Sequence, residues 1–298
     1  KICDGSGENG VDTTAAGGYY RFDNLTADNY VVLLPADNFR NVGGGDTVAG
    51  DPLAGYYSSG TSISAGGVVS DGTSNDPDTT ATDSDENGIS TLSGNAINYV
   101  ASAAVTLGPG SSEPLNETDL SGGQGAVDGY ANMTVDFGFY RQTLGNLVFT
   151  DINGDGDYDA GTDGLLSGAV VQLYSSNGTE INVGPDGILG TSDDAAGGVT
   201  TGAGGTYQFS GLPQGDYIVR VTPPAGNSTV DTSAPADTTD PDTNTDNNDN
   251  GIGTGTGQVS SGIVTLTPGQ GTGGTAGAAN NIVDNSTGST NDPTVDFG

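Results

Sequence analysis

Residues 205–219 decide the fold of this chain, and they read Gly-Thr-Tyr-Gln-Phe-Ser-Gly-Leu-Pro-Gln-Gly-Asp-Tyr-Ile-Val. Large apolar side chains alternate with polar ones before the Pro-Gln-Gly segment, and a second apolar stretch follows it. A period of two residues is typical of a β-strand with one buried face, and Pro and Gly mark the turn between two such strands. The stretch therefore predicts two strands joined by a short turn.

The same pattern occurs a second time, at residues 18–32, which read Gly-Tyr-Tyr-Arg-Phe-Asp-Asn-Leu-Thr-Ala-Asp-Asn-Tyr-Val-Val. Two further blocks are also duplicated: residues 82–89 resemble 245–252, and residues 134–138 resemble 294–298. Three blocks in the same order indicate a tandem array of one structural unit. We expect two domains, at residues 1–141 and 142–298.

The two copies differ at their beginnings. The second copy contains residues 144–174, with two apolar segments around an acidic run, and the first copy has no counterpart to them. We therefore expect the domain at 1–141 to lack its first strands and the domain at 142–298 to be complete. A sheet edge without its neighbour demands a partner strand, which another subunit could add. The alternative is that the chain is a fragment of a longer protein.

Short β-branched and aromatic segments predict an all-β protein, because no segment of useful length shows the 3.6-residue period of a helix. The expected architecture is a tandem of antiparallel Ig-like or prealbumin-like β-sandwiches with long calcium-ordered loops. The predicted strands of the first copy are 19–22, 30–34, 103–107 and 134–140; those of the second are 146–150, 169–174, 206–209, 216–221, 262–267 and 294–297.

Composition excludes several classes of function. The 298 residues include 38 acidic and five basic side chains, a net charge of −33, and no histidine. So few basic residues cannot form the stripe that binds nucleic acid. No apolar run approaches the ~20 residues of a membrane span. Cys3 is the single cysteine, so no disulfide forms within the chain. We expect no enzyme, since histidine-based catalysis is impossible and carboxylates in Gly/Asp loops lack an apolar pocket.

One acidic run has the spacing of a calcium loop. Residues 151–159 read Asp-Ile-Asn-Gly-Asp-Gly-Asp-Tyr-Asp, with oxygen-bearing side chains at alternate positions and glycine at the sixth. Alternate side chains can then point inward around a hard cation while the glycine allows a sharp turn. Thr162 stands at the twelfth position, where glutamate is usual, and Asp163 is the expected substitute. The predicted Ca²⁺ ligands here are Asp151, Asn153, Asp155, the carbonyl of Asp157, Asp159 and Asp163.

Further acidic segments are weaker candidates, with solvated turns or linkers as the alternative. Oxygen ligands favour Ca²⁺ over soft metals, and zinc is excluded by the absence of histidine and the single cysteine. The predicted ligands are Asp186, the Ile188 carbonyl, Asp193 and Asp194 in one loop; Asp4, Ser6, Glu8 and Asp12 in its first-copy counterpart; and Asp83, Asp85 and Glu86 with Asp246, Asp249 and Asn250 in a third pair.

The order of motifs resembles a known family. Residues 145–156, then Val-Gln-Leu-Tyr at 171–174, then the opening stretch resemble the SdrD B-like, calcium-binding B-type repeat of microbial surface proteins, a relative of collagen-adhesin B and prealbumin-like sandwiches. The resemblance implies an extracellular module stiffened by Ca²⁺, with Asp151, Asn153, Asp155 and Asp159 on the calcium loop. Some relatives carry a Lys–Asn crosslink, but residues 142–298 contain no lysine.

Two functions follow as hypotheses. The first is a structural protein at the cell surface, whose repeats self-associate into a filament, sheath or stalk. The second is a monomeric adhesin for a host, matrix or glycan ligand, with Tyr19, Tyr20, Tyr56 and Tyr57 as a possible sugar platform, although paired tyrosines in a thin core are the simpler explanation. Six Asn-x-Ser/Thr sequons would allow glycosylation of a secreted protein.

Overall fold

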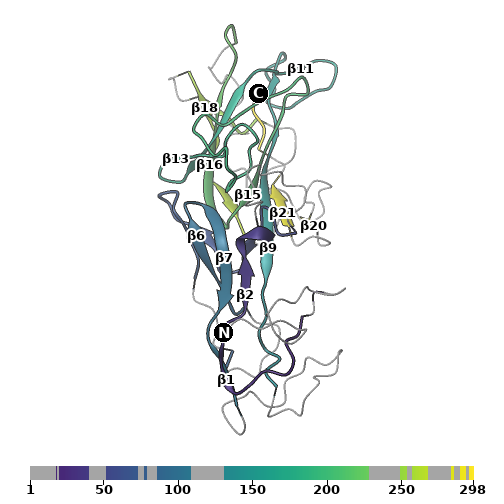
Figure 1. Ribbon diagram of the computed structural model, residues 1–298. Coiled ribbons are helices and arrows are strands. Elements are labelled where there is room, and N and C mark those ends of the chain that lie inside the picture. Colours follow the sequence, from purple (N-terminus) through teal and green to yellow (C-terminus); the bar gives the residue numbers. More distant parts are fainter. Residues whose placement is uncertain are drawn as a thin grey trace.

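The described part of the chain is all-β, as predicted, apart from one short 3-10 turn, η1 (Ala36–Asn38). Figure 1 shows an elongated arrangement in which β11, β13, β16 and β18 lie toward one end and β1 toward the other. The computed structural model describes residues 18, 20–39, 52–72, 77–78, 86–108, 131–227, 249–253, 257–267, 283–284, 289–292 and 295–298.

The second copy is a sandwich whose first sheet is built on β12 (Val170–Ser175) and β16 (Gly215–Thr222). These strands pair antiparallel over six residues, from Val170 opposite Thr222 to Ser175 opposite Tyr217. The apolar period of two brings Val171, Leu173 and Val219 to the inner face, where they are fully buried. The sheet is completed by β13 (Glu180–Ile181), β14 (Val199–Thr200), β17 (Ile252–Gly253), β18 (Val259–Ser260) and β19 (Val264–Leu266).

The second sheet is built on β15 (Thr206–Leu212) and β9 (Phe139–Leu147), which pair antiparallel. Leu144 and Phe209 from this sheet join the buried cluster formed by the first sheet. The two sheets thus enclose one apolar core, as in a β-sandwich. On the other side of β9 lies β21 (Ser289–Asp292), which is parallel to it, and then β20 (Val283–Asp284); the hairpin of β10 (Phe149–Thr150) and β11 (Gly164–Leu165) follows β9.

The first copy repeats part of this architecture in the same register. Tyr30 lies opposite Val105 as Tyr217 lies opposite Val264, and each of these tyrosines donates its hydroxyl to a carbonyl four residues earlier. The predicted duplication is therefore visible at the level of strand pairs. The strands are β1 (Asp28–Tyr30) with β8 (Val105–Leu107), β2 (Leu33–Pro35) with β7 (Ala96–Ser102) and β6 (Gly88–Ser93), and the short β3 (Tyr57–Ser58), β4 (Ser62–Ile63) and β5 (Val69–Ser70).

No break separates the two copies, because β9 belongs to both. Tyr140 pairs with Tyr57 of β3, while the following residues pair with β15. The expected boundary between 141 and 142 therefore falls inside one strand. The Tyr140 hydroxyl accepts the Gln214 amide at 2.8 Å, and the Gln214 carbonyl accepts the Ile63 amide at 2.9 Å. At Gly215 a Cβ would lie 2.5 Å from Ile63, so only glycine permits this close approach.

Several predicted strands are wrong. Residues 20–23 and 131–138 are irregular, although 206–212, the counterpart of the former, is strand β15. The reason is a missing neighbour, since β15 owes its ladder to β9 and the first copy has no equivalent of that segment. At the end of the second copy, Asp296 and Phe297 form only isolated bridges. The hairpin of β6 and β7 was missed; its signal was the Gly94-Asn95 turn between two β-prone runs.

Candidate functional site

The predicted calcium loop joins β10 to β11 and is held by hydrogen bonds between its own side chains and backbone. The Asp151 carboxylate accepts the amides of Gly154 at 2.7 Å and Gly156 at 2.9 Å. The Asp163 carboxylate accepts the amides of Ile152 at 2.9 Å and Asp159 at 2.7 Å. Asp163 thus connects the beginning of the loop to its later residues through backbone amides, while its role as a ligand stays a prediction.

The donor set of this loop fits a hard cation in chemistry. The Asn153 side-chain amide donates to Asp155 at 2.7 Å and lies 3.4 Å from a carboxylate oxygen of Asp159, so three of the predicted ligands adjoin one another. A rotation of the Asn153 amide by half a turn would present its oxygen instead of its nitrogen. The Asp157 amide donates to Asp155 at 3.1 Å. All the predicted side chains therefore lie on one short loop and offer oxygen.

A second acidic loop lies between β13 and β14. The Asp186 carboxylate accepts the Ile188 amide at 2.9 Å, and the Asp194 carboxylate accepts the Gly190 amide at 2.9 Å. The Thr191 hydroxyl lies between the predicted ligands, donating to Asp193 at 2.7 Å and lying 3.0 Å from the Ile188 carbonyl. The structure thus gathers these four predicted ligands around one hydroxyl.

Burial, with a smaller contribution from neighbouring charge, disfavours the ionised carboxylates of this loop. Partial burial raises the pKa of Asp194, and burial together with the neighbouring Asp193 charge raises the pKa of Asp186. Carboxylates that resist ionisation in this way are stabilised by a cation placed among them. Within the part of the chain that the structure describes, no group of three or more Asp, Glu or Cys side chains is spaced to hold a metal ion. Whether a cation binds here or in the Asp151 loop therefore stays a prediction.

The third predicted pair has a structural explanation. Asp249 is fully buried, and its carboxylate accepts the amides of Gly251 at 2.7 Å and Gly298 at 3.1 Å. In the first copy Glu86 does the same for Gly88, at 2.7 Å, and for Gly138. In each copy the carboxylate therefore connects the last segment of the copy to the residues that directly follow the acid in the sequence. Sequence reasoning missed this role, although the duplicated Asn-Gly-Ile and Val-Asp-Phe-Gly motifs were its signal.

Asparagines complete this fastening in both copies. The Asn250 side chain accepts the Asp296 amide at 2.9 Å, and Asn87 accepts the Asp136 amide at 2.7 Å. The Asp249 amide in turn donates to the carbonyl of Gly156 in the predicted calcium loop at 2.7 Å. The predicted ligands Asp4, Ser6, Glu8, Asp12, Asp83, Asp85 and Asp246 lie outside the described residues.

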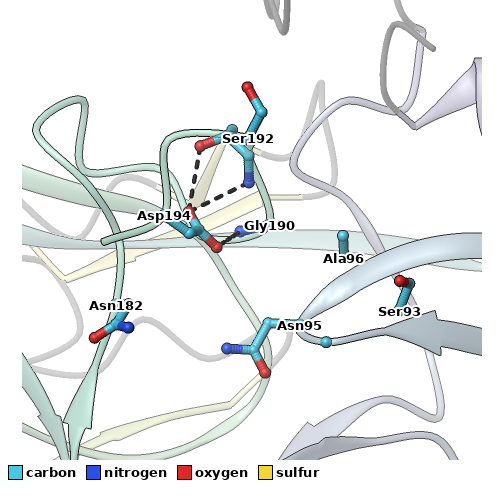
Figure 2. Close-up of a pocket in the computed structure, with 9 residues that line it drawn as sticks. Ser93, Asn95, Ala96, Asn182, Gly190, Ser192 and Asp194 are labelled. Atoms are coloured by element: carbon cyan, nitrogen blue, oxygen red, sulfur yellow. Dashed lines mark hydrogen bonds between the residues drawn. The ribbon is translucent and has the colours of Figure 1, made fainter. Parts of the chain in front are cut away.

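A polar groove of about 360 Å³ lies where the copies meet (Figure 2). The turn at Asn95 forms one wall, and Asn182, Ser192 and Asp194 form the other, as the close-up shows. The Tyr57 hydroxyl donates to the Asn95 carbonyl at 2.9 Å, which anchors that turn to the junction. The groove therefore places the second acidic loop against the first copy.

The predicted sugar platform of tyrosines is not present as an exposed surface. Tyr57 is buried, and the Tyr20 hydroxyl donates to the Val135 carbonyl at 2.5 Å. The Arg141 guanidinium lies 5.0 Å from the centre of the Tyr56 ring. Tyr19 lies outside the described residues. Tyr20, Tyr56 and Tyr57 therefore pack the first copy and its junction, which agrees with the simpler explanation for these three.

Among the described residues, the strands of the first copy have fewer neighbours than their counterparts in the second. In the described part of the chain β1 pairs only with β8, and β2 only with β7, whereas β16, their counterpart, also pairs with β12. Val31 and Leu33 on this edge are 48% and 52% exposed. Val32 and Leu34 are partly buried, while their counterparts Val219 and Val221 are 0% and 2% exposed. These strands therefore present apolar side chains to water in the described part of the chain.

No helix in the described residues is long and apolar enough to cross a membrane. Residues 142–265 match the family model of the SdrD B-like domain. The serine-aspartate repeat-containing protein D of Staphylococcus aureus (strain Newman) is 34% identical over 116 residues, 38% of this chain and 8% of that protein. The serine-aspartate repeat-containing protein F of Staphylococcus epidermidis is 32% identical over 117 residues, 38% of this chain and 6% of that protein. The chain thus spans under a tenth of these relatives.

Two solved structures overlap weakly with the chain. The group B streptococcus pilus 2b backbone protein has a TM-score of 0.27 at 18% identity, over 93% of this chain and 88% of that chain. The minor pilin GBS52 of Streptococcus agalactiae has a TM-score of 0.25 at 24% identity, over 35% and 48%. Scores of this size do not establish a common arrangement of strands. The family match and the repeat-protein relatives confirm the predicted resemblance and the expected location at the cell surface. Residues 142–265 are therefore similar to the SdrD B-like domain.

Proposed function

We propose that this chain is a rigid structural segment of an extracellular surface protein, in which calcium-stabilised sandwiches build a filament, sheath or stalk. The observation that carries the proposal is the junction between the copies. A modular stalk resists bending only if its modules are joined without a free linker. Here β9 runs through the junction, and the buried cluster contains Tyr57 and Ile63 from one copy and Tyr217 and Leu212 from the other.

Hydrogen bonds across the junction support the same role. The Asn177 amide donates to the Ala65 carbonyl at 3.1 Å, and the Tyr140 hydroxyl links Thr61 to Gln214. Bending the copies apart would break these bonds and open an apolar core, which costs free energy in proportion to the exposed area. A stiff rod of two sandwiches is the expected behaviour in solution.

Small-angle X-ray scattering of the whole chain tests the rod. We expect the maximum dimension and cross-section of a single elongated particle, unchanged between low and high salt. The variant Ile63→Asp places a charge against Gly215 and should broaden the distance distribution, while Val68→Asp, on an exposed residue of the same region, should not. A broad ensemble in the unaltered chain would contradict the proposal.

Calcium would add stiffness at the two loops of the second copy. Asp151, Asn153, Asp155 and Asp159 would hold one ion with Asp163, and Asp186, Asp193 and Asp194 a second with the Ile188 carbonyl. When bound, Ca²⁺ supplies positive charge that offsets the repulsion among these carboxylates. The melting temperature should therefore fall in excess EGTA and recover with added Ca²⁺ but not with Mg²⁺. An unchanged melting temperature would remove calcium from the proposal.

Assembly of the chain into a polymer is the most specific part of the proposal. The open edge of β1 and β2 supports addition of a strand from a neighbouring subunit, because unpaired amides and carbonyls at a sheet edge form a template for another strand. Electron microscopy of the native material should show filaments or a sheath. Dispersed single particles, with saturable binding of a glycan or host protein, would instead favour the adhesin, which no exposed aromatic surface in the described residues supports.

A further inference from the structure

Four of the six Asn-x-Ser/Thr sequons begin at described residues, and the fold treats them differently. An attached glycan is bulky and lies at the surface, so an acceptor asparagine needs an amide nitrogen that faces water. The asparagines of these four sequons are Asn24, Asn132, Asn177 and Asn227. The hydrogen bonds of their side chains therefore decide which of them can carry a glycan.

The sequon at Asn132 is closed by the fold. The Asn132 Nδ2 donates to the Pro77 carbonyl at 2.9 Å, and Thr134, the hydroxyl residue of this sequon, is 0% exposed. The Thr134 hydroxyl also donates to the Pro77 carbonyl, at 3.1 Å. A glycan on the Asn132 Nδ2 would have to fit against this backbone and a buried threonine. We therefore expect this sequon to carry no glycan.

The sequon at Asn177 is open, and its geometry is fixed. Residues 177–179, Asn-Gly-Thr, lie in the turn between β12 and β13, where Asn177 and Thr179 are exposed. The Asn177 Oδ1 accepts the Thr179 backbone amide at 3.0 Å and the Thr179 hydroxyl at 2.8 Å. Because a backbone amide can only donate, the atom that faces it is Oδ1, and Nδ2 points away. Within the part of the chain that the structure describes, this Nδ2 donates no hydrogen bond.

The other two described sequons present their acceptors less completely. The Asn227 Nδ2 donates to the Pro224 carbonyl at 3.1 Å. At Asn24 the backbone is left-handed, with a φ of 59°, and the Thr26 hydroxyl lies 3.3 Å from a tyrosine hydroxyl. At Asn177, by contrast, the threonine hydroxyl is bound to the acceptor side chain itself. The two groups that define the sequon are thus presented together.

The turn that carries Asn177 lies against the first copy. The Asn177 backbone amide donates to the Ala65 carbonyl at 3.1 Å, and a Cβ on Gly66 would lie 3.7 Å from the Asn177 Nδ2. Because Gly66 has no side chain, a sugar attached to this Nδ2 fits beside its backbone. The first sugar of a glycan would therefore cover the contact between residues 64–68 of the first copy and residues 175–179 of the second.

We propose that Asn177 carries an N-linked glycan whose first sugar shields this contact between the two copies. The donor is a glycan linked through a phosphate to a membrane polyprenol. Transfer forms a bond between the Asn177 Nδ2 and the anomeric carbon and breaks the bond between that carbon and the phosphate oxygen. The lipid phosphate leaves with the electron pair of the broken bond, the Nδ2 proton passes to solvent, and nothing is oxidised or reduced.

Mass spectrometry of proteolytic fragments tests the modification. Trypsin cuts after Arg141 and Arg220, so the fragment 142–220 contains Asn177 as its single sequon. In chain purified from the native cell surface, we expect this fragment to be heavier than its sequence by the mass of a glycan. A fragment 142–220 with the mass of its sequence would overturn the proposal.

A second fragment tests the selection between sequons. A cut after Glu117 together with the tryptic cut releases the fragment 118–141, which contains only the sequon at Asn132. We expect this fragment to have the mass of its sequence, because the fold closes that sequon. A glycan on the fragment 118–141 would overturn the selection by hydrogen bonding and burial.

Variants at Thr179 assign the linkage. Thr179→Val keeps the branched shape of this exposed side chain but removes its hydroxyl, so the added mass should be lost from the fragment 142–220. Thr179→Ser keeps a hydroxyl and should keep the added mass. Added mass that persists in the Thr179→Val chain would place the sugar on a different side chain and overturn the linkage to Asn177.

Amide hydrogen exchange tests the shield. We expect several-fold slower exchange at residues 64–68 and 175–179 in the glycosylated chain than in the Thr179→Val chain. Exchange in β1 and β8, toward the other end of the molecule (Figure 1), should be equal. Unglycosylated chain with and without Thr179→Val is the matched control, and the two should exchange alike. Equal exchange with and without the glycan would overturn the shield, whereas the rod is judged separately by its scattering.

Discussion

The first and second copies share strand register and tyrosine hydroxyl bonds, yet they bury their cores to different extents. Val219 is 0% exposed, whereas Val32, which occupies the same place in the first copy, is only partly buried. The difference comes from residues 142–175, which supply β12 and most of β9 to the sandwich of the second copy, while β9 pairs with the first copy only through β3. The local sequence thus specifies each pair of strands. Residues 142–175 determine whether the apolar core is shielded from water.

The largest effect is expected where a buried acid fastens a copy. Asp249→Ala would leave the amides of Gly251 and Gly298 without their acceptor, and two such losses cost roughly 2–4 kcal/mol. Glu86→Ala should cost about half as much, because Glu86 is less buried than Asp249. Urea unfolding followed by circular dichroism measures both. Equal losses of unfolding free energy in the two variants would mean that the two acids stabilise their copies equally.

The next largest effect is expected from calcium, which should stabilise the second copy and leave the first copy unchanged. Asp151→Ala with Asp155→Ala should lower the unfolding free energy by about 2–3 kcal/mol at a Ca²⁺ concentration near 100 times the Kd. The loss should appear as faster amide hydrogen exchange around β10 and β11, with exchange in β6 and β7 unaltered. Asp28→Ala, an exposed acid of the first copy, is the control. Faster amide hydrogen exchange throughout both copies would contradict a calcium site confined to the second copy.

Matched core truncations compare the two sandwiches directly. Val219→Ala should cost about 2 kcal/mol, and Val32→Ala under about 1 kcal/mol, because a buried methyl group removed from a closed core leaves a cavity while one at an open edge does not. Binding of a donor strand should raise the cost of Val32→Ala toward that of Val219→Ala. Thermal unfolding of dispersed and assembled material gives both numbers, and a cost of Val32→Ala that does not change on assembly would argue against strand addition there.

The smallest effect is expected from pH. Burial raises the pKa of Glu86 in the first copy and of Asp186 and Asp194 in the second above their ordinary values of 4.5 and 3.8. A raised pKa means that the folded chain binds the proton more tightly than the unfolded chain does. The contribution is therefore complete below the ordinary values and is lost as pH rises through the raised ones.

Calcium-free protein should accordingly gain stability as pH falls from 7 toward 4.5 through these three groups. The gain is modest, because solvent screens partly exposed carboxylates. Asp194→Asn should flatten the profile in EGTA, and added Ca²⁺ should reverse its slope through the second copy. Urea unfolding at a series of pH values measures it; a stability that rises with pH in EGTA would contradict the assignment of these shifts.

The sequence by itself determined the class, the duplication and the acidic loops. Alternation around Tyr207 and Tyr217 predicts strands because the period of two is a local property of an extended chain. The spacing of Asp151, Asn153 and Asp155 likewise identifies a loop that offers oxygens to one point, and the family resemblance follows from the same motifs. The absence of a counterpart to residues 144–174 predicts an open edge in the first copy, which stays a prediction.

Only the tertiary structure decided how these pieces act. Residues 20–23 have the strand pattern of 207–210 but are irregular, because a strand needs a neighbour and the pattern cannot supply one. Asp249 is a predicted ligand but is buried against two backbone amides, and Leu33, in a predicted strand, is 52% exposed. Pairing, burial and exposure depend on contacts between segments far apart in the chain, and the closing of each sandwich is such a contact.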